Sequence, residues 1–133
     1  MSRRKKTYTD YEIIKNIAKI LVLHRVWNGL SQTNIAKDLN VSFQQVQKYE
    51  KCMNEISWGK GVNLCMKRKW DSTLFQSNKP ESILDEWTKD TNQMDPESSP
   101  YPLRISQIIE RWKTIDRVGK DNYYRKHHFT KGD

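Results

Sequence analysis

Apolar residues recur every three or four positions along most of the chain, and this period predicts helices. The first predicted helix spans residues 10–27, and Thr9 or Asp10 is placed to act as its N-cap. The Asn28-Gly29 pair predicts its end, because both residues adopt left-handed backbone conformations readily. The apolar stripe of this helix consists of Ile13, Ile14, Ile17, Ile20, Leu21 and His24.

Three shorter helices are predicted downstream, and each is preceded by a serine that can cap it. Their ranges are 32–39 after Ser31, 43–52 after Ser42 and 58–70 after Ser57.

The pattern is looser beyond residue 71. Residues 80–89 predict a short helix with Pro80 in its first turn, and residues 91–102 are rich in turn formers. A longer amphipathic helix is predicted at 103–118, where Gly119 ends it before a basic, aromatic tail. No segment alternates convincingly in the manner of a strand, so the predicted fold class is all-α. The stripe of the long helix consists of Ile105, Ile108, Ile109, Trp112 and Ile115.

Charge divides the chain into three parts. The 133 residues carry a net charge of +8. Residues 1–70 hold fourteen Lys and Arg against five Asp and Glu, residues 71–100 two against seven, and residues 101–133 eight against four. This asymmetry indicates three functional regions and suggests a polyanionic partner.

Several classes of protein are disfavoured by the motifs that the sequence lacks. Cys52 and Cys65 are too few to staple a secreted fold, and neither they nor His127-His128 have the spacing of a metal site. No window approaches a membrane span, and no nucleophile–base or paired-carboxylate spacing implies an active site. We therefore expect a cytoplasmic protein without a metal, a cofactor, a membrane partner or enzymatic activity.

Residues 29–50, GLSQTNIAKDLNVSFQQVQKYE, form the most informative segment. Two short serine-capped helices are separated by a tight connection, and Ala36 is small enough to let the second helix approach closely. This pattern is typical of a helix-turn-helix, in which the second helix enters the major groove of DNA and the first crosses the backbone. The positions expected to face inward are Leu30, Ile35, Ala36, Leu39, Val41, Val46 and Tyr49.

This segment resembles the Xre/Cro family of phage and bacterial repressors, which have a lambda-repressor-like fold. The matching motifs are GLSQ at 29–32, IAKDL at 35–39 and NVSFQQVQKYE at 40–50, and the resemblance covers roughly residues 10–70. It implies a compact all-α helix-turn-helix bundle that binds operator DNA, usually as a dimer. The family commonly has glycine where Cys52 stands.

The resemblance also implies which residues read the bases. The base-reading positions of the family fall on Phe43, Gln44 and Gln45, with Lys48 one turn later. The chemistry suits this role independently, because Gln can pair with adenine, Lys with guanine, and Phe with a thymine methyl group. Glutamines of this kind are common on solvated helix faces, but within this motif we favour base contact.

Phosphate contacts are expected around the same helix. Gln32 matches the phosphate-binding position of the family, at a helix N-terminus. Ser42, Lys51 and Asn54 are further candidates. The basic segment 1–9 is either an arm along the duplex or a solubilising tail, and its cations are Arg3, Arg4, Lys5 and Lys6.

Two further sets of residues are expected to be architectural. In the resembled repressors an arginine near the end of the first helix pairs with a glutamate that ends the recognition helix, and Arg25 and Glu50 match these positions. The stripe at 105–115 belongs either to a core helix or to a dimerisation helix. We favour dimerisation, because operator half-sites reward two-fold symmetry.

The expected organisation is an arm at 1–9, a DNA-binding domain at 10–70, an acidic linker with a short helix at 71–102, and a C-terminal helix and tail at 103–133. The predicted function is that of a homodimeric regulator that binds specific double-stranded DNA, with a repressor of phage or bacterial origin favoured. Residues 71–133 could also hold a protein partner. The alternatives are a DNA-recognising assembly factor in packaging or replication, an autoregulatory antitoxin, or a helix-turn-helix that binds protein.

Overall fold

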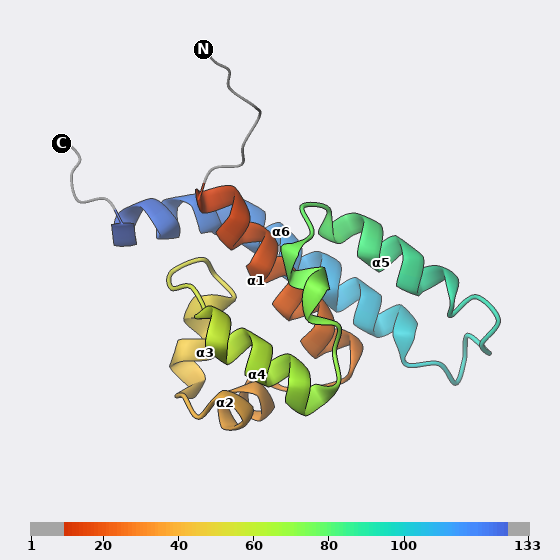
Figure 1. Ribbon diagram of the computed structural model, residues 1–133. Helices are drawn as coiled ribbons and strands as arrows, with labels where there is room; N and C mark the ends of the chain where they lie inside the picture. The colour runs from red at the N-terminus through yellow and green to blue at the C-terminus, as the bar shows by residue number, and fades with distance from the viewer. Residues whose placement is uncertain (1–9, 128–133) are drawn as a thin grey trace, which may run out of the picture.

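The computed structural model describes residues 10–127, and every regular element in that range is helical (Figure 1). The chain is therefore all-α in its described part, as predicted. The elements are α1 (Asp10–Trp27), α2 (Gln32–Leu39), α3 (Phe43–Tyr49), α4 (Trp58–Arg68), the 3-10 helix η1 (Ser72–Gln76), α5 (Pro80–Lys89) and α6 (Tyr101–His127).

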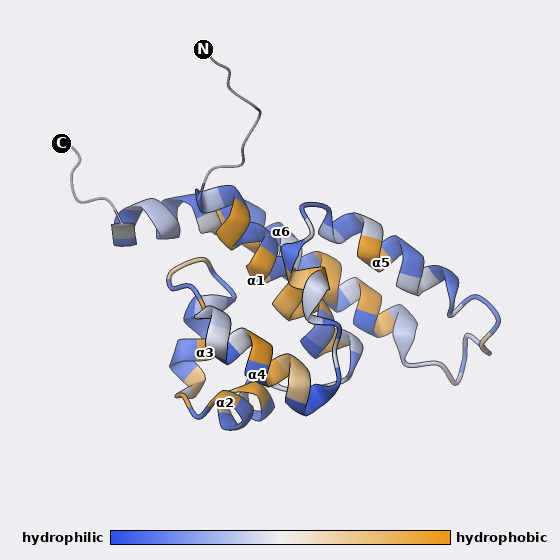
Figure 2. Cartoon of the chain, viewed as in Figure 1, coloured by the Kyte–Doolittle hydropathy of each residue, from blue (hydrophilic) through white to orange (hydrophobic). Residues whose placement is uncertain are grey.

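Helix α1 lies at the centre of the molecule and contributes to two hydrophobic cores. Helices α2, α3 and α4 pack on one side of it, and α5 and α6 cover another (Figure 1). In Figure 2 the apolar residues gather where α1 meets its neighbours, whereas the far end of α6 is hydrophilic. The core around the helix-turn-helix consists of Leu21, Ile35, Ala36, Leu39, Val46, Tyr49 and Leu64.

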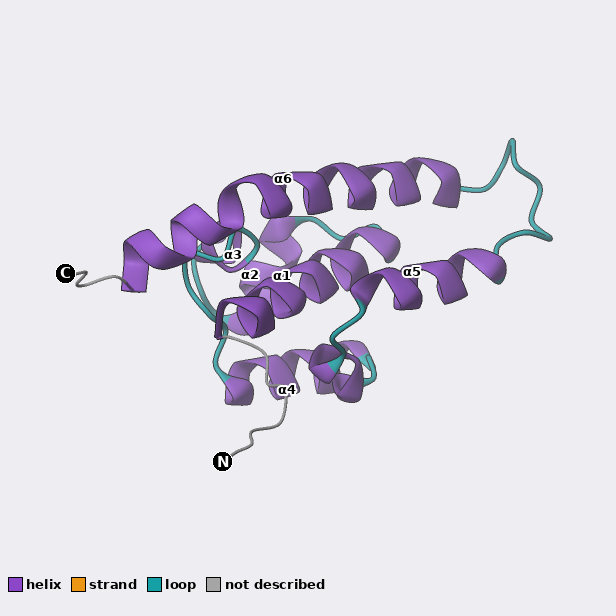
Figure 3. Ribbon diagram, turned by 90° about the horizontal axis from the view of Figure 1, so that it is seen from above, coloured by secondary structure: helices purple, strands orange, loops and turns teal. Residues whose placement is uncertain are grey.

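Helix α6 runs antiparallel to α1 along its length (Figure 3). Tyr11 near the start of α1 packs on Tyr123, with ring centroids 5.7 Å apart, and Trp27 at its end packs on Tyr101 at 4.5 Å. Midway, the Trp112 indole N–H donates to the Lys19 carbonyl at 2.9 Å. The two halves of the sequence are thus joined through α1.

The serine caps predicted for the short helices are present. The hydroxyls of Ser31, Ser42 and Ser57 each accept a hydrogen bond from the backbone N–H three residues later. Ser31 forms a complete capping box, because the Asn34 side chain accepts from its backbone N–H in return. Helix α3 ends at Tyr49, earlier than the predicted Cys52, and Cys52 has a left-handed φ of 64°.

The predicted end of the long helix at Gly119 is wrong. Helix α6 begins at Tyr101 and continues to His127, so part of the expected tail is helical. A Cβ at Gly119 would lie 3.1 Å from the Cys52 sulfur and 3.2 Å from the Tyr11 hydroxyl. Glycine is therefore used here for close packing between elements and not as a helix stop.

The apolar stripe on α6, which we expected to form a dimer interface, lies mostly in the core of one chain. Ile108, Trp112 and Ile115 are at most 5% exposed, because they pack on α1 within one chain. Ile105 is half-buried against the same core, and only Ile109, at 41%, is substantially exposed. Most of the stripe is thus core, since α1 supplies the apolar surface that a partner chain was expected to supply.

The η1 turn was not predicted, because its five residues are too few to show a helical period. It packs against both α1 and α4. Among the described helices, none is long and apolar enough to span a bilayer.

Candidate nucleic-acid interface

Helices α2 and α3 form the predicted helix-turn-helix. The turn between them is closed by Asn40, whose φ of 56° lets the Val41 N–H donate to the Ala36 carbonyl at 3.0 Å. Ala36 and Leu39 of α2 and Val46 of α3 are buried in the core around the helix-turn-helix. The two helices therefore pack directly on each other, with α3 on the outside of the molecule (Figure 1).

The outer face of α3 presents three of the four predicted base-reading residues to solvent. Phe43 is 41% exposed, and Gln44 and Lys48 are also exposed. Val46 and Tyr49, on the opposite face, are buried. This exposed face offers an aromatic ring, an amide and an ammonium group within one and a half helical turns, which suits contact with base edges.

Gln45 differs from its neighbour because its side chain is held by the protein. The Asn54 amide donates to the Gln45 side-chain oxygen at 3.3 Å. This contact orients the side-chain oxygen of Gln45 and leaves its amide N–H groups as donors. Asn54, predicted to contact phosphate, is thereby placed where it can orient a base-reading side chain.

The ion pair predicted between Arg25 and Glu50 is present and buried. Arg25 Nε lies 2.6 Å from Glu50 Oε2, and Arg25 Nη2 lies 3.0 Å from Oε1. Both side chains are at most 5% exposed. Arg25 Nη1 also donates to the Leu30 carbonyl at 3.0 Å, so one guanidinium joins α1, the loop before α2 and the end of α3.

Two further side chains approach the Glu50 carboxylate. The sequence predicted a different role for Gln32 and gave no indication of Arg111. The Gln32 amide donates to Glu50 Oε1 at 2.9 Å, so this candidate phosphate ligand also braces α2 against the end of α3. Arg111 of α6 lies 4.0 Å from the same oxygen. Nothing in the local sequence indicates Arg111, because it lies 61 positions from Glu50 along the chain.

The remaining phosphate candidates lie around the same surface. The Ser42 hydroxyl caps α3 by accepting from the Gln45 N–H at 3.0 Å and is exposed. Lys51 is exposed, and its carbonyl accepts from the Asn122 amide at 3.0 Å. Asn122 was missed because the sequence assigned it to a tail. The arm cations Arg3, Arg4, Lys5 and Lys6 lie outside the described residues.

Some of the basic residues of α4 are structural. Arg68 forms an ion pair with Asp38, and the Lys67 ammonium donates to the Asp38 carbonyl at 2.7 Å. Lys60 reaches the Leu39 carbonyl at 3.4 Å. These cations lie at the negative end of the α2 dipole and fix α2 against α4. Part of the positive charge of the first half therefore stabilises the fold.

The histidine and cysteine side chains of the described core are not grouped for metal binding. In residues 10–127 no three His, Cys, Asp or Glu side chains gather as a ligand set. His24 is 2% exposed, and burial lowers its pKa. Burial also raises the pKa of the Cys52 thiol to about 11, so this group is protonated at neutral pH. The side chains of His127 and His128 lie outside the described part.

Sequence comparisons find proteins named as helix-turn-helix transcriptional regulators. The chain is 29% identical over 119 residues to an uncharacterized HTH-type transcriptional regulator of Sinorhizobium fredii, covering 89% of this chain and 80% of that protein. It is 36% identical over 72 residues to an uncharacterized HTH-type transcriptional regulator of Rickettsia conorii, covering 50% of this chain and 58% of that protein. A counterpart in Rickettsia prowazekii is 38% identical over 64 residues, or 44% of this chain and 49% of that protein.

No protein-family model matches the chain, and no solved structure matches it. All three relatives have the same description, HTH-type transcriptional regulator. The alignment with the Sinorhizobium protein extends over most of the chain. The chain is therefore similar to proteins named as helix-turn-helix transcriptional regulators, and α2 and α3 have the helix-turn-helix arrangement that this name implies.

Proposed function

We propose that this protein is a transcriptional regulator of the Xre/Cro type that recognises a specific double-stranded DNA sequence with α3. The observation that carries the proposal is the outer face of α3, where Phe43, Gln44 and Lys48 are exposed and the opposite face is buried. In this proposal Gln44 pairs with adenine, Lys48 with guanine, and Phe43 contacts a thymine methyl group.

The buried ion pair sets the angle at which that face is presented. Arg25 and Gln32 both bind the Glu50 carboxylate, so α1, α2 and the end of α3 form one braced unit. Such bracing pre-organises a reading surface, which lowers the ordering cost of binding. The phosphate contacts would come from Ser42, Lys51 and the first turn of α2.

Repression requires no catalytic group, because occupancy of a promoter is enough to block polymerase. We therefore propose a repressor of bacterial or phage origin, acting in the cytoplasm as a homodimer on an inverted repeat. Because Ile108, Trp112 and Ile115 are core residues, any dimer contact through α6 falls on its outer face, where Leu103 is 66% and Ile109 is 41% exposed.

The test is selection of bound duplexes from a random pool, followed by fluorescence anisotropy titrations of the selected duplex at two salt concentrations. We expect an inverted repeat with half-sites about one helical turn apart. Gln44→Ala should weaken binding to the selected duplex by about 1–3 kcal/mol and leave binding to random DNA unchanged.

Gln107→Ala is the matched control, because Gln107 is an exposed glutamine that belongs to α6 and not to α3. It should bind both duplexes as the wild type does. Recovery of no preferred sequence, or an equal effect of the two substitutions, would refute recognition by α3. Sedimentation of the protein–duplex complex with one chain per inverted repeat would refute the dimer.

A further inference from the structure

A cleft of about 600 Å³ lies where α1, α4 and α5 end. Its walls come from Trp27, Trp70, Trp87 and Tyr101, with His24 also lining it. The volume lies within the range of small-molecule sites, which are mostly apolar with a few placed polar groups. All four wall residues are only partly buried, so they expose aromatic surface to the cleft.

The aromatic rings of the cleft are organised around His24. Its imidazole lies 4.7 Å from the Trp70 ring, 5.3 Å from the Phe75 ring and 5.2 Å from the Trp87 ring, centroid to centroid. The Trp27 ring packs beside Trp87, with ring centroids 5.4 Å apart. Rings at these separations form a preorganised surface on which a further planar ring can stack.

His24 has one ring nitrogen without a protein partner in residues 10–127. Its Nδ1 lies 3.1 Å from the Ile20 carbonyl, which can only accept, so Nδ1 carries the hydrogen. Burial lowers the pKa of the imidazole, so Nε2 is an unprotonated acceptor at neutral pH. No hydrogen bond to Nε2 is formed by the described residues, although the side chain is 2% exposed. A buried acceptor of this kind requires a donor.

The charged residues that line the cleft are exposed to solvent. They are one cation, Lys69, and two carboxylates, Asp71 and Asp90, and the Asp71 carboxylate already accepts from the backbone and hydroxyl of Thr73. The Trp27 carbonyl at the end of α1 already accepts from Arg104 at 3.0 Å. Solvent screens these exposed charges, and one positive against two negative charges disfavours an anion. The buried and half-buried residues of the lining are uncharged, which favours a neutral ligand.

We propose that this cleft binds a small, neutral, planar aromatic compound that stacks on the tryptophans and donates a hydrogen bond to His24 Nε2. The proposal goes beyond DNA binding and does not depend on it, because the cleft shares none of its wall residues with the exposed face of α3.

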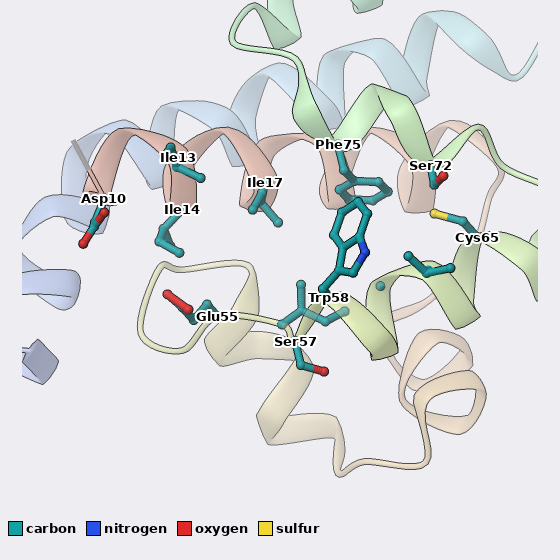
Figure 4. Close-up of a pocket in the computed structure, with 13 residues that line it drawn as sticks. Asp10, Ile13, Ile14, Ile17, Glu55, Ser57, Trp58, Cys65, Ser72 and Phe75 are labelled. Atoms are coloured by element: carbon teal, nitrogen blue, oxygen red, sulfur yellow. The ribbon is translucent and has the colours of Figure 1, made fainter. Parts of the chain in front are cut away.

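The groove beside Trp58 does not support a comparable inference (Figure 4). It has a volume of about 380 Å³ and is walled largely by apolar side chains of α1 and α4. Asp10, Glu55 and Ser57 are exposed there and Ser72 is half-buried, so no buried charged or hydroxyl group selects a ligand chemistry.

The test uses ¹⁹F NMR with two probes, 5-fluoroindole and 5-fluoro-1-methylindole, which differ in the N–H donor. We expect the ¹⁹F resonance of 5-fluoroindole to broaden on addition of the full-length protein. Its affinity should be roughly fivefold to tenfold higher than that of its N-methyl analogue, which is the difference that one hydrogen bond implies. His24→Phe keeps an aromatic ring and should abolish that difference. Trp58→Phe, outside the cleft, should preserve it.

Absence of binding at millimolar 5-fluoroindole would overturn the proposal. Equal affinities of the wild type for the two probes would also overturn it, and this comparison needs no variant. Displacement of 5-fluoroindole by choline at equal concentration would show that the cleft prefers cations, and would overturn the neutral ligand class.

Discussion

The Glu50 carboxylate accepts two hydrogen bonds from the Arg25 guanidinium, at 2.6 and 3.0 Å, in a position that is almost completely buried. Truncating one partner leaves the other charge buried and unpaired. We therefore expect Glu50→Ala to lower the free energy of unfolding by about 3–5 kcal/mol. Urea denaturation monitored by circular dichroism measures this change.

An exposed ion pair on α6 provides the control. Lys113 and Glu110 are 3.8 Å apart with both side chains more than 70% exposed, so Glu110→Ala should change stability by less than about 1 kcal/mol. The double variant Arg25→Met/Glu50→Leu removes both buried charges and should be more stable than Glu50→Ala. Equal losses for Glu50→Ala and Glu110→Ala would contradict the structural role of the buried pair.

Gly119 is predicted to be a packing glycine in spite of its place inside a helix. Alanine normally stabilises a helix interior by about 1 kcal/mol relative to glycine. At Gly119 the added Cβ would meet the buried Cys52 sulfur at 3.1 Å, so we expect Gly119→Ala to be destabilising. In a Cys52→Gly background the sulfur is absent, and the same substitution should lose part of its penalty, because only the Tyr11 hydroxyl at 3.2 Å remains close. Thermal unfolding of the four proteins measures this coupling.

Gly61 in α4 is the matched control. A Cβ there would meet nothing within 4 Å, so Gly61→Ala should raise stability by up to about 1 kcal/mol. If Gly119→Ala were stabilising to the same extent, close packing of α6 on the turn after α3 would be disproved.

His24 should make stability depend on pH in the mildly acidic range. Burial lowers its pKa below the ordinary value of 6.5, so the unfolded chain takes up a proton before the folded one. The stabilisation is complete above pH 6.5 and is lost as pH falls from there towards the folded pKa, with a slope of at most about 1.4 kcal/mol per pH unit. Denaturation of wild type and His24→Phe at pH 7.5, 6.5 and 5.5 isolates this contribution.

The Asp71 carboxylate, whose negative charge raises the pKa of His24, does not obscure the comparison between wild type and His24→Phe. Its hydrogen bonds with Thr73 lower its pKa from 3.8, so it titrates below the pH window tested. An unchanged difference between wild type and His24→Phe across the three pH values would contradict a neutral, buried imidazole.

Asn54 is expected to act through Gln45. Because its amide holds the Gln45 side-chain oxygen at 3.3 Å, Asn54→Ala frees the Gln45 amide to rotate. The expected result is a weaker preference at one base-pair position, with little change in binding to random DNA. Competition binding against single-base-pair variants of the selected duplex measures it.

Lys51→Ala supplies the contrasting behaviour of a phosphate contact. It should weaken binding to all duplexes alike. The slope of log K against log salt concentration should become shallower by about one unit. If Asn54→Ala behaved in the same way, Asn54 would be a phosphate ligand and its role in orienting Gln45 would be wrong.

The local features of this fold could be predicted from sequence because neighbouring residues decide them. The caps at Ser31, Ser42 and Ser57 depend on a hydroxyl and an N–H three residues away. The left-handed turn at Gly29, with φ of 70°, likewise depends on one residue. The resemblance added the Arg25–Glu50 pair, whose partners are 25 positions apart.

The features that were mispredicted depend on contacts between distant segments. Gly119 was predicted to end the helix because glycine commonly follows the last turn of a helix. The Cys52 sulfur that leaves no room for a side chain there belongs to a turn far away in the sequence. The α6 stripe looked available for a second chain because an apolar period does not say which surface covers it.

The sequence by itself therefore determined where most helices begin, which face of each is apolar, and that α2 and α3 form a helix-turn-helix, since these depend on short-range caps and periodicity. Only the tertiary structure decided that α6 packs along α1, that Glu50 is shared by Arg25 and Gln32, and that His24 lines an aromatic cleft. These arrangements arise when surfaces far apart in the chain are buried against each other, and no local pattern records which surfaces will meet.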